Sequence, residues 1–137
     1  MLLDTHAWLW AVDDDARLGR KTRNLLLKAE ARSALRISVV SVFEIIALHT
    51  AGRLQLARTP EQWMREALES PWVRLAELTS SIAIDGGSIP RAALPDPTDR
   101  LLVATARQFD VGFVTADRAI LAYASRTRSV RVHDASL

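Results

Sequence analysis

Short apolar segments alternate with amphipathic segments along almost the whole chain, and this alternation most strongly limits the folds it can adopt. The expected strands are residues 1–3, 36–40, 72–78, 111–115 and 129–132. The expected helices are residues 7–12, 16–34, 41–50, 61–69, 80–85, 97–108 and 118–124. Strands that alternate with helices form a parallel sheet with right-handed crossovers and helices on both faces. We therefore predict a three-layer α/β/α fold around a central parallel sheet of about five strands.

Composition restricts the size and setting of this fold. The chain has 137 residues, of which 49% are hydrophobic and 25% charged, so we expect one domain spanning residues 1–137. It contains no cysteine, which excludes disulfides and cysteine-bound zinc. The longest apolar run, residues 39–48, is interrupted by Ser41 and Glu44 and is too short to span a membrane. The start of the chain lacks the basic region of an export signal, so we expect a cytoplasmic protein.

Positive charge is concentrated in residues 17–36, where seven lysines and arginines face one acid, Glu30. Such a run is commonly a solvated helix face, but it is also typical of a surface that contacts phosphates. Within the expected helix, four of these side chains are spaced to share one face. These candidate RNA-binding residues are Arg17, Lys21, Lys28 and Arg32.

The segment Asp96-Pro97-Thr98-Asp99 has the features of a helix start. Proline suits the first helical turn, so Asp96 is the expected N-cap and Asp99 the third helical residue. Apolar residues follow Asp99 three, four and seven positions later, at Leu102, Val103 and Ala106. Asp99 therefore lies in line with the buried stripe of the helix, where an acid needs a partner.

Acidic residues also follow the ends of other expected strands. Asp4 follows the first strand, Glu44 the second and Asp117 the fourth. Taken singly, Glu44 fits a capping box with Ser41, and Asp117 fits an N-cap. Asp4 has no helix start immediately after it that would explain it. Because like charges in close proximity are costly without a cation, the joint pattern indicates a Mg²⁺ or Mn²⁺ site suited to phosphodiester hydrolysis.

Four segments together resemble the PIN-domain ribonucleases, and most closely the VapC-type toxins of prokaryotic toxin–antitoxin pairs. They are Leu3-Asp4-Thr5-His6, Ser41-Val42-Phe43-Glu44-Ile45, residues 96–106 and Thr115-Ala116-Asp117. The resemblance implies a Mg²⁺- or Mn²⁺-dependent endoribonuclease that cleaves single-stranded RNA, with an antitoxin protein as its partner. It also implies that Asp4, Glu44, Asp99 and Asp117 are the catalytic metal-binding acids, with Asp96 auxiliary and Thr5 helping to hold the first acid or its water.

The chain departs from the family at two places. Many members have a lysine shortly after the second acid, where this chain has Leu48 and His49, and many have an aromatic residue at position 98, where it has Thr98. Neither position is a predicted ligand. The departures therefore concern the choice of substrate and partner rather than the metal site.

Several alternatives remain beside this interpretation. A haloacid-dehalogenase-like phosphatase needs an aspartate at position 6, which is His6, and a nucleotide-binding fold needs a glycine-rich turn after the first strand. A response-regulator-like module needs a late lysine, and no lysine follows Lys28. A housekeeping nuclease without an antitoxin and a catalytically silent binding module stay open, as does a homodimer. The three histidines are taken as structural or surface residues and the four tryptophans as core residues.

Overall fold

The computed structural model describes residues 1–137 and contains five parallel strands in the order β3-β2-β1-β4-β5. The strands are β1 (Leu2–Leu3), β2 (Leu35–Ser38), β3 (Val73–Ala76), β4 (Phe113–Thr115) and β5 (Val132–Asp134). Every neighbouring pair is parallel, and β1 pairs with both β2 and β4. The chain first builds the sheet outward through β2 and β3, then returns to add β4 and β5 on the other side of β1. The expected number and direction of the strands are confirmed.

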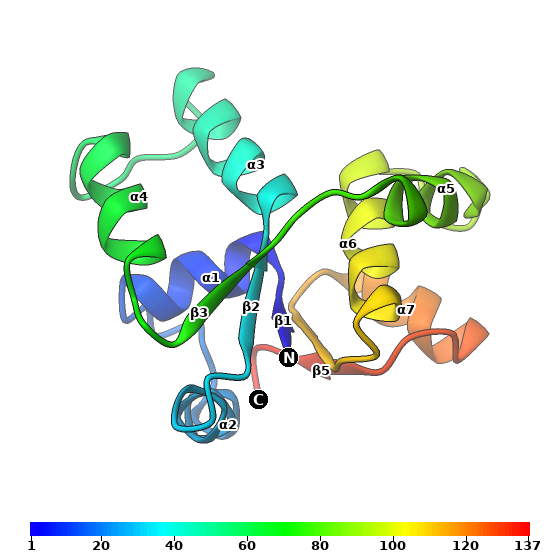
Figure 1. Cartoon of the computed structure of the whole chain (residues 1–137), viewed down its shortest axis with the longest axis horizontal. Helices are drawn as coiled ribbons and strands as arrows, with labels where there is room; N and C mark the ends of the chain where they lie inside the picture. Colours follow the sequence, from blue (N-terminus) through cyan, green and yellow to red (C-terminus); the bar gives the residue numbers. More distant parts are fainter.

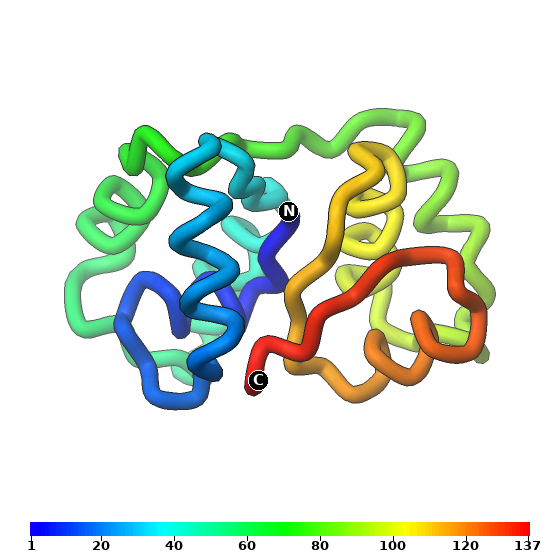
Figure 2. The backbone as a smooth tube through the Cα atoms, turned by 90° about the horizontal axis from the view of Figure 1, so that it is seen from below, coloured from blue at the N-terminus to red at the C-terminus, as the bar shows by residue number.

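Helices cover both faces of this sheet, which gives three layers (Figures 1 and 2). They are α1 (Thr5–Val12), α2 (Arg20–Glu30), α3 (Val39–Thr50), α4 (Pro60–Leu68), α5 (Ser80–Ser88), α6 (Pro97–Gln108) and α7 (Arg118–Thr127). Side chains alternate across a strand, so Leu3 joins a core with α1 to α4, whereas Leu2 joins a second core with α6 and α7. The predicted α/β/α architecture is therefore confirmed.

The basic helix is shorter than predicted, because α2 covers residues 20–30 rather than 16–34. Its N-cap, Gly19, lies against the C-terminal segment, and a Cβ atom at this position would be only 2.0 Å from the backbone oxygen of Leu137. The N–H of Thr22 donates to the same oxygen. Arg17 and Arg32 therefore lie outside the helix, and the predicted shared face of four cations is wrong.

Several other predicted boundaries also differ from the structure, and three of them change the account of the fold. The hydroxyl of Ser38 accepts from the N–H of Val40, so α3 begins at Val39 and the predicted capping box between Ser41 and Glu44 does not form. Helix α5, which packs closely along α6, extends to Ser88 rather than ending at residue 85. Strand β5 is shifted to residues 132–134 by its pairing with β4. None of the helices combines the length and apolar character needed to cross a membrane.

Candidate active site

Five acidic residues meet at the carboxyl ends of β1 and β4. These strands are neighbours at the point where the strand order reverses, which is where parallel α/β sheets commonly bind ligands. Asp4 follows β1 and Asp117 follows β4. The second turn of α3 carries Glu44 to the same edge, and the start of α6 carries its N-cap Asp96 and Asp99 there; Figure 1 shows how these elements meet. The negative charges of the other four acids all act on Asp99, so the predicted acids are brought together.

Asp4 is the buried member of this cluster, with 6% of its surface exposed. It occupies the N-cap position of α1 but makes no side-chain capping bond, so a helix does follow it, contrary to the prediction. Its carboxylate instead accepts a 2.6 Å hydrogen bond from the hydroxyl of Thr115 on β4. Burial raises the pKa of Asp4 above its usual value. The Thr115 bond and the charge of His6 oppose the rise, and the negative charge of Glu44 adds to it.

Glu44 is held between two threonines that come from different helices. The hydroxyl of Thr5 on α1 donates to Oε2 of Glu44, and the hydroxyl of Thr98 on α6 donates to Oε1 at 2.9 Å. Ser41, one turn earlier on α3, lies 2.9 Å from the Thr5 hydroxyl. The side chain of Thr5 therefore contacts Glu44, and only its backbone N–H serves the first acid, Asp4.

Asp99 lies among the other acids and has an unusually high pKa of about 7. Burial is the largest cause, followed by the negative charges of Asp117, Asp96, Asp4 and Glu44. Asp99 is in the first turn of α6, where the helix dipole favours a negative charge, yet that effect is outweighed. At neutral pH, the cluster therefore holds at least one carboxylate near its titration point.

Asp96 and Asp117 both cap helices, as the local sequence predicts. Oδ1 of Asp96 accepts from the N–H of Thr98 at 2.8 Å, and Oδ1 of Asp117 accepts from the N–H groups of Ala119 and Ile120. Both side chains are exposed and keep their second carboxylate oxygen free of any hydrogen bond within the protein. Capping orients these acids and still leaves each of them an oxygen for another partner.

Three of the four predicted RNA-binding residues, Lys21, Lys28 and Arg32, lie away from the acids, on α2 or in the turn after it. Lys21 and Lys28 are exposed on α2, which lies beyond the amino ends of β1 and β2 in Figure 1. Its N-terminal turn packs against the segment that follows β5. Arg17 pairs with Asp15 at 2.6 Å, and Arg32 lies in the turn after α2. The structure therefore does not join these four cations to the acidic edge as one continuous track.

Two hydroxyl donors of the site were missed by sequence reasoning. Thr115 and Thr98 both stand inside motifs that were singled out, immediately before Ala116-Asp117 and between Asp96 and Asp99. Their bonds join residues 111 and 54 positions apart in the chain. The position of each threonine beside an acid was a usable signal, but its acceptor could not be identified without the fold.

The carboxylate oxygens of these acids suit a hard divalent cation. All the partners that the acids have within the protein are hydroxyl or backbone N–H groups, and the ion pairs of the structure involve other carboxylates. Oxygen ligands of this kind are preferred by Mg²⁺ and Mn²⁺. As the side chains stand, no three acids or histidines form a preformed coordination group, so ion binding requires the carboxylates to turn.

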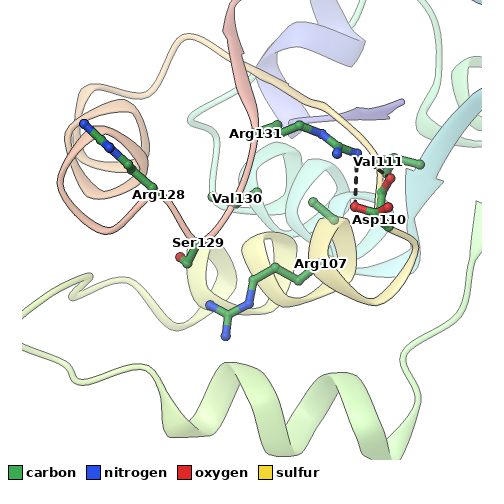
Figure 3. Close-up of a pocket in the computed structure, with 8 residues that line it drawn as sticks. Arg107, Asp110, Val111, Arg128, Ser129, Val130 and Arg131 are labelled. Atoms are coloured by element: carbon green, nitrogen blue, oxygen red, sulfur yellow. Dashed lines mark hydrogen bonds and ion pairs between the residues drawn. The ribbon is translucent and has the colours of Figure 1, made fainter.

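A separate cavity of about 360 Å³ lies at the amino ends of β4 and β5 (Figure 3). Arg131 in its wall points to Asp110 and pairs with it at 3.1 Å, and Arg107 pairs with Asp85 at 2.7 Å. Arg128 points away from these two arginines (Figure 3). The positive side chains of this cavity are thus divergent and largely neutralised.

Comparison with known proteins places the whole arrangement in one family. The model of the PIN domain matches residues 1–125. The chain is 31% identical over 120 residues to Ribonuclease VapC22 of Mycobacterium tuberculosis, which covers 88% of each protein. Its fold matches VapBC2 of Rickettsia felis bound to promoter DNA, with a TM-score of 0.69, 13% identity and 96% of each chain covered. It also matches DNA-bound VapBC of Salmonella typhimurium, with a TM-score of 0.65, 20% identity, and 97% and 96% of the two chains covered. The resemblance seen in the sequence is confirmed: the chain belongs to the PIN-domain family and is a relative of the VapC ribonucleases.

Proposed function

We propose that this protein is a Mg²⁺- or Mn²⁺-dependent endoribonuclease that cleaves single-stranded RNA and acts in the cytoplasm as the toxin of a toxin–antitoxin pair. The observation that carries the catalytic part is the crowding of carboxylates around the partly buried Asp99. Burial and then the charges of these acids raise its pKa to about 7, and no cationic side chain opposes the rise. A divalent ion would relieve this repulsion. The relationship to Ribonuclease VapC22 supports the choice of RNA as substrate.

In this proposal, the catalytic acids that hold the metal are Asp4, Glu44, Asp99 and Asp117. A bound Mg²⁺ or Mn²⁺ supplies an activated water for attack at phosphorus and charge stabilisation for the leaving oxygen. Thr115 orients Asp4, and Thr5 and Thr98 orient Glu44, through the hydrogen bonds described above. Asp96 is auxiliary, because it accepts a 2.7 Å bond from the Thr98 hydroxyl and so fixes the donor that Glu44 uses.

The proposed protein partner is an antitoxin. The structural matches are complexes of VapBC type, which supports the same kind of assembly for this chain. An arginine fork is complementary to a cluster of carboxylates, because it donates to two oxygens at once. We therefore expect a small partner protein that directs an arginine to the acids and blocks the site. A homodimer of the toxin is compatible with this assembly.

Exposed cations near α2 are proposed to attract RNA. Lys21, Lys28 and Arg32 are exposed, and Arg17 keeps two thirds of its side chain exposed although it pairs with Asp15. Replacing Lys21 and Lys28 by alanine should weaken RNA binding and reduce the slope of log affinity against log salt by roughly 0.7 per lost contact. An unchanged slope in a salt titration would assign these residues to the solvated surface.

The catalytic proposal is tested by incubating the purified chain with a labelled single-stranded RNA in Mn²⁺, in Mg²⁺ and in EDTA. We expect cleavage in either metal, none in EDTA, and loss of cleavage in Asp99→Asn. Asp110→Asn is the matched control, because Asp110 lies at the opposite edge of the sheet and pairs with Arg131. Full activity in EDTA, or in Asp99→Asn, would contradict the proposal.

The toxin role is tested separately by expressing the chain from its native operon and purifying it by gel filtration. We expect a complex with a small protein and growth arrest when the chain is expressed alone. A lone, harmless 15.2 kDa chain that still cleaves RNA would instead support the housekeeping nuclease without an antitoxin.

A further inference from the structure

Three side chains that the proposed chemistry does not use border the acidic site. His6 and Trp10 lie four residues apart on α1 and therefore on the same face of the helix, with ring centroids 6.5 Å apart. The guanidinium carbon of Arg17 lies 5.0 Å from the centroid of the Trp10 ring. Asp15 holds this arginine in place through hydrogen bonds of 2.6 and 3.0 Å. An aromatic residue with a cation on its ring thus stands beside the carboxylates.

The rings and the acids share one cavity. A hollow of about 190 Å³ is lined by Asp4, His6, Trp10, Ala116 and Asp117. Two of the residues that line it, Asp4 and Asp117, are proposed catalytic acids, and two more, His6 and Trp10, carry aromatic rings. The cavity opens at the same edge of the sheet as the proposed reaction site.

Core packing does not account for Trp10 in the way it does for other tryptophans. Trp8 and Trp63 are 1% and 0% exposed and pack edge to face at 5.1 Å, as core residues do. Trp10 is only partly buried and presents part of its ring to the cavity. The prediction that the four tryptophans are core residues is thus confirmed only in part for Trp10, which packs against the core and also borders the cavity. It is wrong for Trp72, which is 47% exposed.

We propose that this cavity is a subsite for one nucleobase of single-stranded RNA, next to the phosphate that is cleaved. The inference rests on the proposed function and adds to it the way the substrate is held. The acids around the metal position repel the RNA backbone wherever the cation does not neutralise them, so an attraction that does not depend on phosphate charge strengthens substrate binding beside them. An indole face supplies one, because every base can stack on it, and a paired base in a duplex has no free face to offer.

The three side chains have distinct tasks in this subsite. Trp10 provides the stacking surface, and exposed His6 stands at the edge of the same hollow, where its ring nitrogens can meet polar groups of a base. Arg17 keeps two thirds of its side chain exposed and carries a positive charge to the rim of a site that is otherwise acidic. It is thus placed for the phosphate on the far side of the bound base.

The experiment compares variants of Trp10 on an RNA with a single cleavage site, in Mn²⁺. Trp10→Leu keeps an apolar side chain for packing but removes the aromatic face, whereas Trp10→Phe keeps an aromatic face. We expect Trp10→Leu to lower kcat/KM by about tenfold, which is within the range measured for base stacking, and Trp10→Phe to lower it much less. Trp72→Leu is the matched control and should leave cleavage unchanged, because Trp72 is exposed and immediately precedes β3, an edge strand that is separated from β1 and β4 by β2.

The substrate provides a second measurement that does not depend on the folding of a variant. An abasic nucleotide on one side of the cleavage site should slow the wild-type chain by a similar factor, and on this substrate Trp10→Leu and wild type should be equal. The inference would be overturned if wild type and Trp10→Leu cleaved the intact RNA equally. It would also be overturned if Trp10→Leu were slower than wild type by the same factor on the intact and the abasic RNA. Loss of antitoxin binding in Trp10→Leu with unchanged cleavage would overturn it as well. If the wild-type chain cleaves no RNA in Mn²⁺, the proposed function itself fails.

Discussion

The acids at the two edges of the parallel sheet differ in whether they form ion pairs. At the amino edge, arginines and acids neutralise each other, as in the pairs Arg107–Asp85 and Arg131–Asp110. At the carboxyl edge, Asp4 and Asp99 form no ion pair. Burial and neighbouring acids raise their pKa values, and the charge of His6 opposes only part of the rise at Asp4. Acids that are paired stabilise a fold modestly, whereas unpaired and crowded acids cost stability until something binds them. The uncompensated edge is therefore where a ligand is required.

The largest contrast is expected in catalysis when a threonine hydroxyl is removed. Thr98→Val deletes the donor to Glu44 and to Asp96, so the acid loses one of its two positioning bonds. We expect RNA cleavage to fall by about 10- to 100-fold, as when partners of metal ligands are removed. The matched change at the other edge is Thr127→Val. In the wild type, the Thr127 hydroxyl contacts only the carbonyl oxygen of Tyr123 and Ser129. A steady-state assay should show no change for that variant, and an equal loss in both would contradict the contrast.

These threonines also mark what a sequence can and cannot predict. The helix start at Asp96-Pro97 was predicted correctly because capping depends on residues two or three positions apart. The start of α3 was predicted wrongly because Ser38 and Ser41 are both suitable caps, and only the sheet decides that the strand ends at Ser38. The grouping of the acids follows from strand ends in a parallel sheet. Their donors Thr98 and Thr115 depend on contacts between distant segments, which local patterns do not encode.

A second contrast concerns the dependence of stability on pH. The folded chain keeps a proton on Asp99 up to about pH 7, whereas the unfolded chain releases it near the ordinary value of 3.8. Unfolding therefore releases protons between these values, and the free energy of unfolding falls as the pH rises through this window. The raised pKa of Asp4 acts in the same direction. In EDTA, we expect the Tm to be higher at pH 5 than at pH 8.

Asp99→Asn should flatten this dependence and raise the Tm at pH 8, because it removes one of the repelling charges. Thermal unfolding followed by circular dichroism measures both effects. A lower Tm for Asp99→Asn at pH 8 in EDTA would indicate that Asp99 serves mainly as a residue of the α6 helix start.

The smallest effect, and one of opposite sign, is expected at the amino edge. Asp85→Asn removes the 2.7 Å pair with Arg107, in which both side chains are about one third exposed. We expect a loss of about 0.2–1 kcal/mol in the free energy of unfolding at pH 8, because exposed ion pairs contribute little. Urea unfolding should detect it, and RNA cleavage should stay unchanged. If Asp85→Asn instead increased the free energy of unfolding, the paired acids of the amino edge would not differ from the unpaired acids of the carboxyl edge in their effect on stability.

The most direct measurement is the change in Tm at pH 8 when millimolar Mn²⁺ replaces EDTA. If the acids form a cation site, an ion at one hundred times its Kd stabilises the fold by about 2.7 kcal/mol, a rise on the order of 10 °C for a chain of this size. We expect this rise in the wild type and in Asp85→Asn, and a much smaller one in Asp99→Asn. An equal rise in Asp99→Asn, or none in the wild type, would contradict the claim that the crowded carboxyl edge is a divalent-cation site.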